Sequence, residues 1–282
     1  MARIQAIGYQ VNQIIKAHNG INLSKKEARA TSGIKGENNH NISNYFHSYK
    51  SLDNARRELT DLGKFAKQNF GIKDMSKITG KVIKEWVKSK DITYKTASNY
   101  ISNIYKVQEY FTLKQGELKE IRENLKETLT KERVLANQSR AYKNLDKVEL
   151  KNPKAQISFE LQKNYGLRVK EATHINLNRQ LKGENILEIQ GKGGKIIIKE
   201  IDKNLVDKIK EYSNEKGIFE IPTRTYTYNL KQAIEATGEK FNGTHGIRHA
   251  FAQNKLEEGY TKQEVSEMMG HNREEITNTY LR

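Results

Sequence analysis

The stretch THGIRHAFAQ, residues 244–253, says most about the fold and chemistry of this chain. It places His245 and Arg248 three positions apart at the expected start of a helix. His249 follows His245 by four positions, a spacing also found between zinc ligands on a helix, but no glutamate stands between them and the chain has no cysteine. We therefore interpret His249 as a packing or supporting residue, and His245 and Arg248 as candidates for chemistry.

A second pair of polar residues lies in MMGHNREEITNTYLR, residues 268–282. His271 follows Gly270, and Tyr280 comes nine residues after His271. A histidine beside a glycine turn is often a helix cap, and a tyrosine near a terminus usually packs, so neither residue identifies a site alone. The ends of helices and the loops between them are nevertheless where binding and catalytic residues concentrate.

Upstream, the sequence predicts a β-hairpin. The β-rich runs ILEIQ (186–190) and KIIIKEI (195–201) flank a Gly-Lys-Gly-Gly turn, which places Lys192 at the hairpin tip. Before the hairpin, a helix is expected to stop at Gly166, and Arg168 follows that stop. An exposed lysine in a turn and a solvated arginine after a helix are common. Lys192 and Arg168 therefore indicate a site only in combination with the histidines, Arg248 and Tyr280 described above.

Taken together, these residues suit one kind of chemistry. Two arginines, a lysine and two histidines favour an anionic substrate, and a tyrosine can act as a covalent nucleophile. Arginine binds the non-bridging oxygens of a phosphodiester bidentately, and lysine or histidine can protonate a leaving alkoxide. A phenol of pKa ~10 becomes a nucleophile when cationic neighbours and an imidazole draw off its proton. The sequence lacks the carboxylate cluster of a two-metal nuclease, so it favours metal-free phosphoryl transfer.

In four ordered boxes the chain resembles the tyrosine recombinases, or phage integrases. The boxes read YGLRVKEA around Arg168, GKGGK around Lys192, HGIRH around Arg248, and MMGHNREEITNTYLR with His271 and Tyr280. The separations also resemble the family, with 24 residues from Arg168 to Lys192 and 23 from Arg248 to His271. The boxes lie in the second half of the chain, and the first half resembles the family only in being basic and helical.

The resemblance implies a catalytic set, which consists of Arg168, Lys192, His245, Arg248, His271 and Tyr280. The two arginines would clamp the scissile phosphate, and Tyr280 would become linked to the 3′-phosphate. Lys192 would be the general acid for the 5′-hydroxyl, with Lys195 in the same turn as the alternative. His245 would act as general base or proton shuttle, and His271 would support the phosphate by hydrogen bonding.

Composition divides the chain into two expected domains. Residues 1–113, which include an N-terminal extension at 1–50, are expected to form a basic helical core-binding domain. Residues 114–134 are strongly charged and are interpreted as a linker that can be helical in part, and residues 135–282 are expected to form the catalytic domain. Within the catalytic domain, a helix is predicted to restart over 169–175.

The first domain also offers candidate DNA contacts. A helix predicted from Thr93 to Phe111 has a polar side that is either a solvated surface or a face laid on DNA. The candidate DNA-contacting residues are Lys95, Asn99 and Ser102 on this helix and Lys195 in the hairpin.

Charge and composition restrict the partner and the compartment. The 282 residues include 50 Lys and Arg against 34 Asp and Glu, a formal net charge of +16. Such a field attracts polyanions, so DNA or RNA is the expected partner, although lysine-rich surfaces also serve solubility. There is no cysteine, no apolar run of ~20 residues and no signal peptide, so we expect a cytoplasmic protein without disulfides, thiolate zinc sites or membrane contact.

These observations lead to one expected fold and function. The fold is expected to be mainly α with a small antiparallel β-sheet, whose two domains form a C-shaped clamp on DNA. The expected function is site-specific recombination or integration of double-stranded DNA through a 3′-phosphotyrosyl intermediate, without cofactor, metal or ATP. The family implies a tetramer on DNA. We expect a nucleoid-associated protein, and the need for accessory proteins stays open. A type IB topoisomerase-like nicking-closing enzyme and a non-catalytic DNA-binding protein remain open as alternatives.

Overall fold

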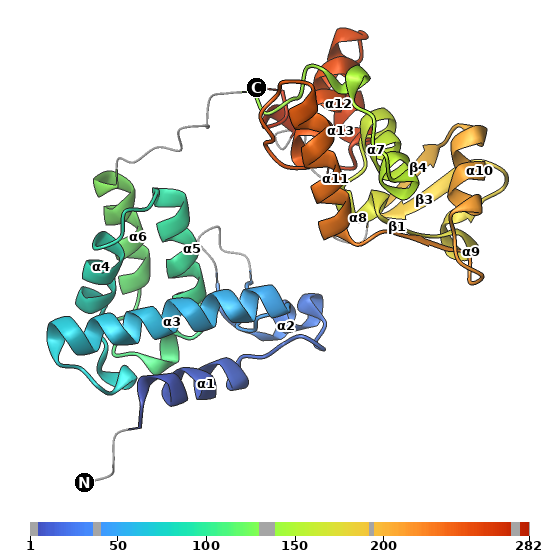
Figure 1. The fold of residues 1–282 in the computed structure, drawn as a ribbon. Coiled ribbons are helices and arrows are strands. Elements are labelled where there is room, and N and C mark those ends of the chain that lie inside the picture. Colours follow the sequence, from blue (N-terminus) through green and yellow to red (C-terminus); the bar gives the residue numbers. More distant parts are fainter. Residues whose placement is uncertain (1–4, 36–40, 130–138, 192–194, 272–276, 282) are drawn as a thin grey trace. The chain divides into compact units, whose positions relative to one another are not determined.

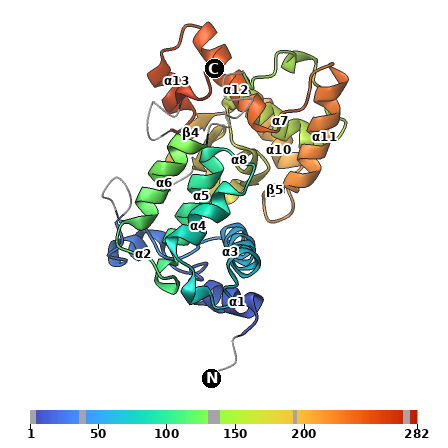
Figure 2. The same ribbon diagram turned by 90° about the vertical axis from the view of Figure 1, so that its left-hand side faces the viewer.

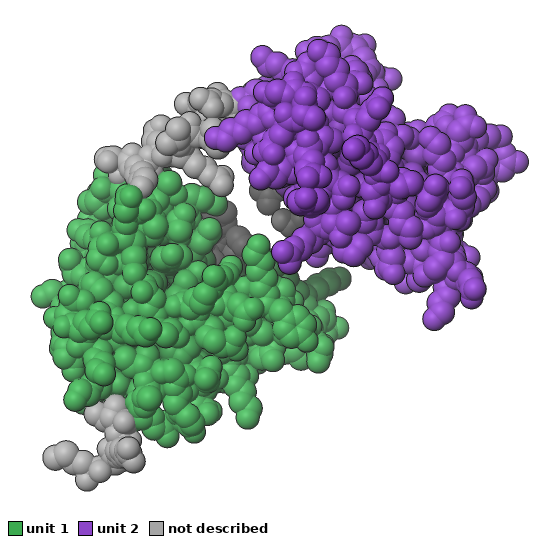
Figure 3. All heavy atoms as spheres, in the orientation of Figure 1, with its two compact units in different colours: residues 1–134 green, residues 135–282 purple. Residues whose placement is uncertain are grey.

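The computed structural model describes residues 5–35, 41–129, 139–191, 195–271 and 277–281. The chain divides into two compact units, residues 1–134 and 135–282, which are coloured separately in Figure 3. Figure 1 shows that the first unit is built from helices and that the second combines helices with short strands. Among the described residues, no helix is both long and apolar enough to cross a bilayer.

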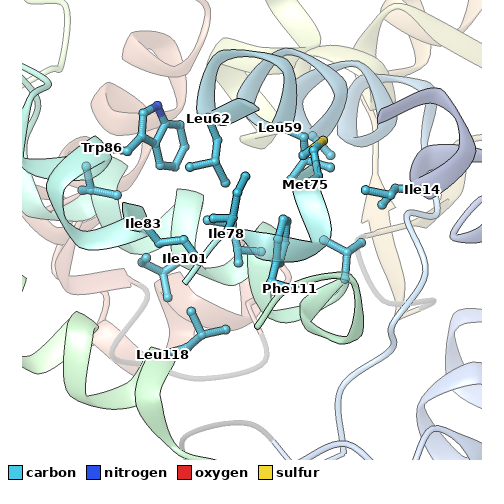
Figure 4. Close-up of a cluster of buried hydrophobic side chains, with 14 of the residues drawn as sticks. Ile14, Leu59, Leu62, Met75, Ile78, Ile83, Trp86, Ile101, Phe111 and Leu118 are labelled. Atoms are coloured by element: carbon cyan, nitrogen blue, oxygen red, sulfur yellow. The ribbon is translucent and has the colours of Figure 1, made fainter. Parts of the chain in front are cut away.

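The helices of the first unit enclose one hydrophobic core. The elements are α1 (Ile7–Ala17), α2 (Lys25–Thr31), α3 (Tyr49–Phe70), η1 (Met75–Lys77), α4 (Gly80–Lys88), α5 (Tyr94–Tyr105), η2 (Gln108–Tyr110) and α6 (Glu117–Thr128). Apolar residues recur at steps of three and four along the longer helices, so each turns one face inward. These faces meet around Leu59, Ile83, Trp86 and Ile101 (Figure 4).

The long helix α3 has clear start and stop signals. The hydroxyl of Ser48 accepts a hydrogen bond from the N–H of Ser51, and the hydroxyl of Ser51 accepts one from the N–H of Ser48. This reciprocal cap satisfies two donors that would otherwise be free. The helix ends at Gly71, whose φ of 68° is the left-handed conformation that favours glycine. Helices α4 and α5 pack on α3, and α6 packs on α4 and α5 (Figure 2).

Part of the expected linker belongs to the first unit. Residues Glu117–Thr128 form α6, and Leu118, Ile121 and Leu125 are buried in the core of that unit. Steps of three and four place these apolar side chains on one face of the helix, while charged residues cover its other faces. The expectation of a linker over 114–134 is therefore wrong for α6.

The second unit packs helices around α7 and adds two small sheets. Its elements are η3 (Leu145–Lys147), α7 (Pro153–Tyr165), α8 (Val169–Ala172), β1 (His174–Asn176), α9 (Leu177–Gln180), β2 (Leu181–Lys182), β3 (Ile186–Gln190), β4 (Ile196–Glu200), α10 (Lys203–Glu211), β5 (Ile218–Glu220), α11 (Thr223–Ala236), α12 (His245–Glu257) and α13 (Lys262–Met268). Helices α8, α10, α11 and α12 all contact α7. The long helix α7 therefore forms the centre of this unit.

The predicted hairpin is present as β3 and β4. The two strands pair antiparallel, with Glu188 opposite Ile198, and β2 extends them to a sheet of order β2-β3-β4. The helix predicted over 169–175 is wrong after Ala172, because His174–Asn176 form β1, which pairs with β5. The predicted fold class, mainly α with small antiparallel sheets, is confirmed, and the C-shaped clamp on DNA stays a prediction.

Candidate active site

Arg248, in the first turn of α12, connects three parts of the second unit. Its side chain is buried, with 1% of the residue exposed. One terminal nitrogen donates a hydrogen bond to the carbonyl of Gly166 at the end of α7, and the other donates to the carbonyl of Met269 after α13. Its Nε is buried and has no hydrogen-bond partner among the described residues. The guanidinium is therefore held by the backbone at two points.

Arg168 precedes the short helix α8 and pairs with Glu171 in the same turn. The Glu171 carboxylate accepts one hydrogen bond from the N–H of Arg168 at 2.8 Å and another from its guanidinium at 2.9 Å. The side chain of Arg168 is 22% exposed, against 10% for Glu171. The carboxylate thus orients the arginine while part of the guanidinium stays open to solvent.

Positive charge dominates this region. Burial lowers the pKa of Arg248 to about 10, and the charge of Arg168 acts in the same direction, whereas Tyr280 and Glu171 oppose the shift. An arginine with this pKa remains cationic at neutral pH. Burial also lowers the pKa of Lys199 on β4 to about 8, and the charge of Arg248 contributes to that shift. Cations that lower one another's pKa stabilise a nearby anion such as a phosphate.

His271 is buried against Arg248. Its Nε2 lies 3.3 Å from a terminal nitrogen of Arg248, and its Nδ1 lies 2.8 Å from the hydroxyl oxygen of Thr277. The ammonium of Lys195 donates a hydrogen bond of 3.1 Å to the backbone carbonyl of His271. Burial lowers the pKa of His271 to about 4, and the neighbouring cations add to the shift. The ring is therefore neutral at pH 7.

The ring of Tyr280 lies among three histidines. The distance between ring centroids is 4.6 Å to His249, 5.1 Å to His271 and 6.4 Å to His245. The guanidinium carbon of Arg248 lies 5.8 Å from the centroid of the Tyr280 ring. The predicted nucleophile is thus next to three imidazoles and one fixed cation of the same unit.

The backbone of Tyr280 is held as well. Its carbonyl oxygen lies 3.3 Å from Nδ1 of His249 and 3.3 Å from Nε2 of Gln253, and these two residues are one turn apart on α12. Its N–H donates a hydrogen bond of 2.8 Å to the carbonyl of Thr277. Tyr280 is therefore held in place by residues of its own unit.

The two histidines on α12 also favour the neutral form. Burial lowers the pKa of His249 to about 4, although its contact with the Tyr280 carbonyl acts in the opposite direction. His245 stands at the more open start of the helix, where partial desolvation lowers its pKa and the charge of Arg248 lowers it further. A neutral imidazole can accept a proton, so His245 can serve as a base for the Tyr280 phenol.

The structure brings together five of the six predicted catalytic residues, namely Arg168, His245, Arg248, His271 and Tyr280. Lys192 lies outside the described residues. Lys195, which was the alternative to Lys192, contacts the backbone of His271. Across the described residues, no group of three or more His, Cys, Asp or Glu side chains is placed to hold a metal ion.

The candidate DNA contacts of the first unit lie on α5. Lys95, Asn99 and Ser102 are all exposed, and the latter two line a polar groove of about 600 Å³ between α3 and α5. The hydroxyl of Ser102 donates to the carbonyl of Ser98 and accepts from Arg122. Among the described residues, no such internal bond is formed by the side chains of Lys95 and Asn99, whereas Ser102 is already engaged within the protein.

Sequence reasoning missed two residues that hold the nucleophile. Gln253 is four residues after His249, so both lie on one face of α12, and that spacing could have indicated a shared target. Thr277 is three residues before Tyr280, or about one helical turn, and a buried threonine at that spacing gives no comparable signal.

Gly166 offers a test of how this site is supported. Its φ is 65°, and a Cβ added there would lie 2.6 Å from Cδ1 of the Phe251 ring. We expect Gly166→Ala to lower the free energy of unfolding by about 2–5 kcal/mol, because the left-handed conformation and the overpacking add. Urea unfolding followed by circular dichroism would measure this change.

Gly183→Ala is the matched control for that experiment. Gly183 has a φ of 60°, but a Cβ there would meet nothing within 4 Å, so only the backbone cost of about 1–2 kcal/mol is expected. The fluorescence of Trp86 reports the first unit and should not change in either variant. Equal losses in the two variants would contradict the predicted clash with Phe251.

Comparison with known proteins identifies a family and individual relatives that this chain resembles. Residues 132–282 match the sequence model described as the Phage integrase family. Tyrosine recombinase XerD of Lacticaseibacillus casei is 30% identical over 140 residues, which are 43% of this chain and 48% of that protein. Tyrosine recombinase XerC of Leptospira interrogans is 30% identical over 131 residues, or 41% of this chain and 42% of that protein. The match thus spans about half the length of these relatives.

Solved structures share the fold over the whole chain. XerH site-specific recombinase, bound to difH substrate in a pre-cleavage complex, has a TM-score of 0.64 at 15% identity and covers 100% of this chain and 94% of its own. A lambda integrase dimer bound to a COC′ core site has a TM-score of 0.57 at 15% identity, with 99% and 96% covered. At these identities the likeness establishes the fold.

Proposed function

Because the chain belongs to the phage integrase family, we propose that it is a site-specific DNA recombinase, which cuts and rejoins double-stranded DNA through a covalent bond to Tyr280. The observation that carries this proposal is the position of the Tyr280 ring, among neutral histidines and beside a buried guanidinium. Transfer of a phosphodiester requires a nucleophile, a proton acceptor and a fixed cation, and these groups lie together here.

Cleavage begins when the phenol oxygen of Tyr280 attacks the scissile phosphorus. The phenol proton passes to His245, and Arg168 and Arg248 stabilise the charge that develops on the non-bridging oxygens. The bond from phosphorus to the 5′-oxygen breaks, and Lys192 supplies the proton that makes a 5′-hydroxyl. The DNA keeps its 3′-phosphate, which is now esterified to the tyrosine.

Strand exchange is the reverse of cleavage with a different hydroxyl. The 5′-hydroxyl of a partner strand attacks the phosphotyrosine and releases Tyr280, so one phosphodiester replaces another and neither ATP nor a metal is needed. Two duplexes present four strands, each of which needs a nucleophile. We therefore propose a tetramer on DNA, with accessory proteins as further partners.

The first unit is proposed to bind the DNA duplex. Residues 1–113 carry 19 basic and 9 acidic side chains, so this part holds most of the excess positive charge. Lys95 and Asn99 on the exposed face of α5 are the proposed contacts, in which lysine binds phosphate and asparagine can reach a base edge. Ser102 contributes less, because its hydroxyl is bonded to Ser98 and Arg122.

Covalent trapping tests the proposed function. Target duplexes are first selected from random DNA by binding to the protein. They are then nicked next to the cleavage position, so that the short product carrying the 5′-hydroxyl diffuses away and religation stops. We expect a protein–DNA band on a denaturing gel in excess chelator, and the band should disappear after protease treatment.

Two further outcomes separate the alternatives. Exchange of differently labelled arms between two target duplexes is expected of a recombinase. Relaxation of supercoiled plasmids without a target site, together with no exchange, would support a nicking-closing enzyme instead. Tight binding of the selected DNA without any covalent band would mean that the protein binds DNA but does not cut it.

The proposed base predicts a pH dependence for cleavage. His245 must be neutral to accept the phenol proton, and its pKa is lowered from the usual 6.5. The cleavage rate should therefore stay constant as pH falls to about 6.5 and decline only below it. His249 and His271, with a pKa of about 4, remain neutral over this range. Single-turnover cleavage between about pH 5 and 8 would measure the profile, and a decline that begins above pH 7 would contradict it.

A further inference from the structure

We propose that Thr277 is a positioning residue that holds the ring of His271 through its Nδ1 and connects that ring to the turn carrying Tyr280. The inference rests on the proposed function, since it assigns a task within the same cleavage reaction. In the proposed cleavage reaction, the Thr277 side chain does not touch the substrate. Thr277 acts on the reaction through His271 and through the backbone of Tyr280.

Thr277 bonds both residues at once. Its residue is fully buried, with 0% exposed, and its hydroxyl oxygen lies 2.8 Å from Nδ1 of His271. Its carbonyl accepts a hydrogen bond of 2.8 Å from the N–H of Tyr280. The rings of His271 and Tyr280 are also in contact, with centroids 5.1 Å apart. A displacement of the turn that carries the nucleophile would therefore also move the partner of His271.

The other ring nitrogen decides the tautomer. Nε2 of His271 faces a terminal nitrogen of Arg248 at 3.3 Å, and a guanidinium can only donate hydrogen bonds. Nε2 must therefore carry a lone pair. Since the buried ring is neutral, its proton resides on Nδ1 and is donated to the Thr277 hydroxyl oxygen. In the protein without DNA, we infer that His271 is the Nδ1–H tautomer.

A hydroxyl is suited to this position because it can reverse its role. To support a phosphate oxygen, His271 must donate from Nε2; water takes the proton from Nδ1 and supplies one to Nε2, so the ring stays neutral with one proton. The Thr277 hydroxyl can then donate to the free Nδ1 instead of accepting from it. Thr277 thus stabilises the ring in the same orientation in both tautomers, whereas a methyl group in place of the hydroxyl supports neither.

Two substitutions separate this role from packing. Thr277→Val keeps the branched shape and the backbone but removes the hydroxyl, and Thr277→Ser keeps the hydroxyl but removes the methyl group. We expect Thr277→Val to lower the single-turnover cleavage rate at saturating DNA by about 10- to 100-fold, by analogy with the loss of hydrogen-bond partners that orient histidines at metal sites. Thr277→Ser should stay within about threefold of the wild type.

The tautomer itself is read by NMR of the full chain with 15N-labelled histidine, without DNA. The wild type and Thr277→Ser should show His271 protonated at Nδ1 and hydrogen-bonded there. Thr277→Val should keep that tautomer, because Arg248 still faces Nε2, but its Nδ1–H signal should lose the shift of a hydrogen-bonded proton. Protonation of wild-type His271 at Nε2 would overturn the proposal even if no variant folded. Equal loss of cleavage in both variants would overturn it too, because packing would then explain the effect.

The two readouts also separate this inference from the proposed function. If the wild type forms no covalent complex with its selected DNA, the proposed function fails, and the NMR tautomer still decides the role of Thr277. If the wild type cleaves DNA while Thr277→Val cleaves at the same rate with an unchanged Nδ1–H signal, only the inference on Thr277 fails.

Discussion

The Tyr280→Phe variant is expected to bind selected target DNA with wild-type affinity and to form no covalent complex with it. Phenylalanine retains the ring that packs against His249 and His271, and the backbone bonds to Gln253 and Thr277 do not involve the hydroxyl. The fold and DNA binding should therefore be preserved. The nucleophilic oxygen is lost, and the covalent band on the denaturing gel should fall below detection.

Tyr260→Phe is the matched control for this variant. Tyr260 lies in the same unit, is 39% exposed and contacts the ammonium of Lys255 rather than the site. Its loss of a phenol should leave both DNA binding and the covalent band unchanged. A covalent complex formed by Tyr280→Phe would place the nucleophile on another residue and would falsify the mechanism, whereas loss of DNA binding would show that the hydroxyl serves structure.

The sequence predicted the components of the site well because the chemistry restricts residue types. Arg168, Arg248 and His271 stand next to helix stops or starts in an order that resembles one family, and the structure places them in contact or within electrostatic range. The backbone acceptors of Arg248 could not be predicted. Every residue has a carbonyl, and only the fold determines that those of Gly166 and Met269 point at the guanidinium.

The two errors in the predicted fold, at β1 and α6, also arise because contacts between residues far apart in the sequence determine the structure there. The strand β1 was missed because its partner β5 lies far away in the sequence, with His174 opposite Glu220, and three residues give no readable alternation. Helix α6 was interpreted as linker because its many charges conceal Leu118, Ile121 and Leu125. In both cases the deciding contact is tertiary, and local composition carries little information about it.

The Arg248→Lys variant is expected to lose cleavage activity and stability together. Lysine keeps the charge but cannot bridge the carbonyls of Gly166 and Met269 and also face His271, because its donors radiate from a single nitrogen. We expect single-turnover cleavage to fall by about 10²- to 10³-fold, as on loss of a fixed donor to a transition-state oxyanion. One buried carbonyl left without a partner should lower the free energy of unfolding by about 1–3 kcal/mol.

Arg168→Lys separates these two effects. The Arg168 side chain is 22% exposed and its bonds go to Glu171, to which a lysine could still form an ion pair. We therefore expect a comparable loss of cleavage but a smaller change in stability, measured by urea unfolding. If Arg248→Lys cleaves DNA at the wild-type rate while losing stability, Arg248 is a structural residue only. In that case the transition-state charge would rest on Arg168 and the hairpin lysines, because the buried guanidinium would serve only to join α7, α12 and α13.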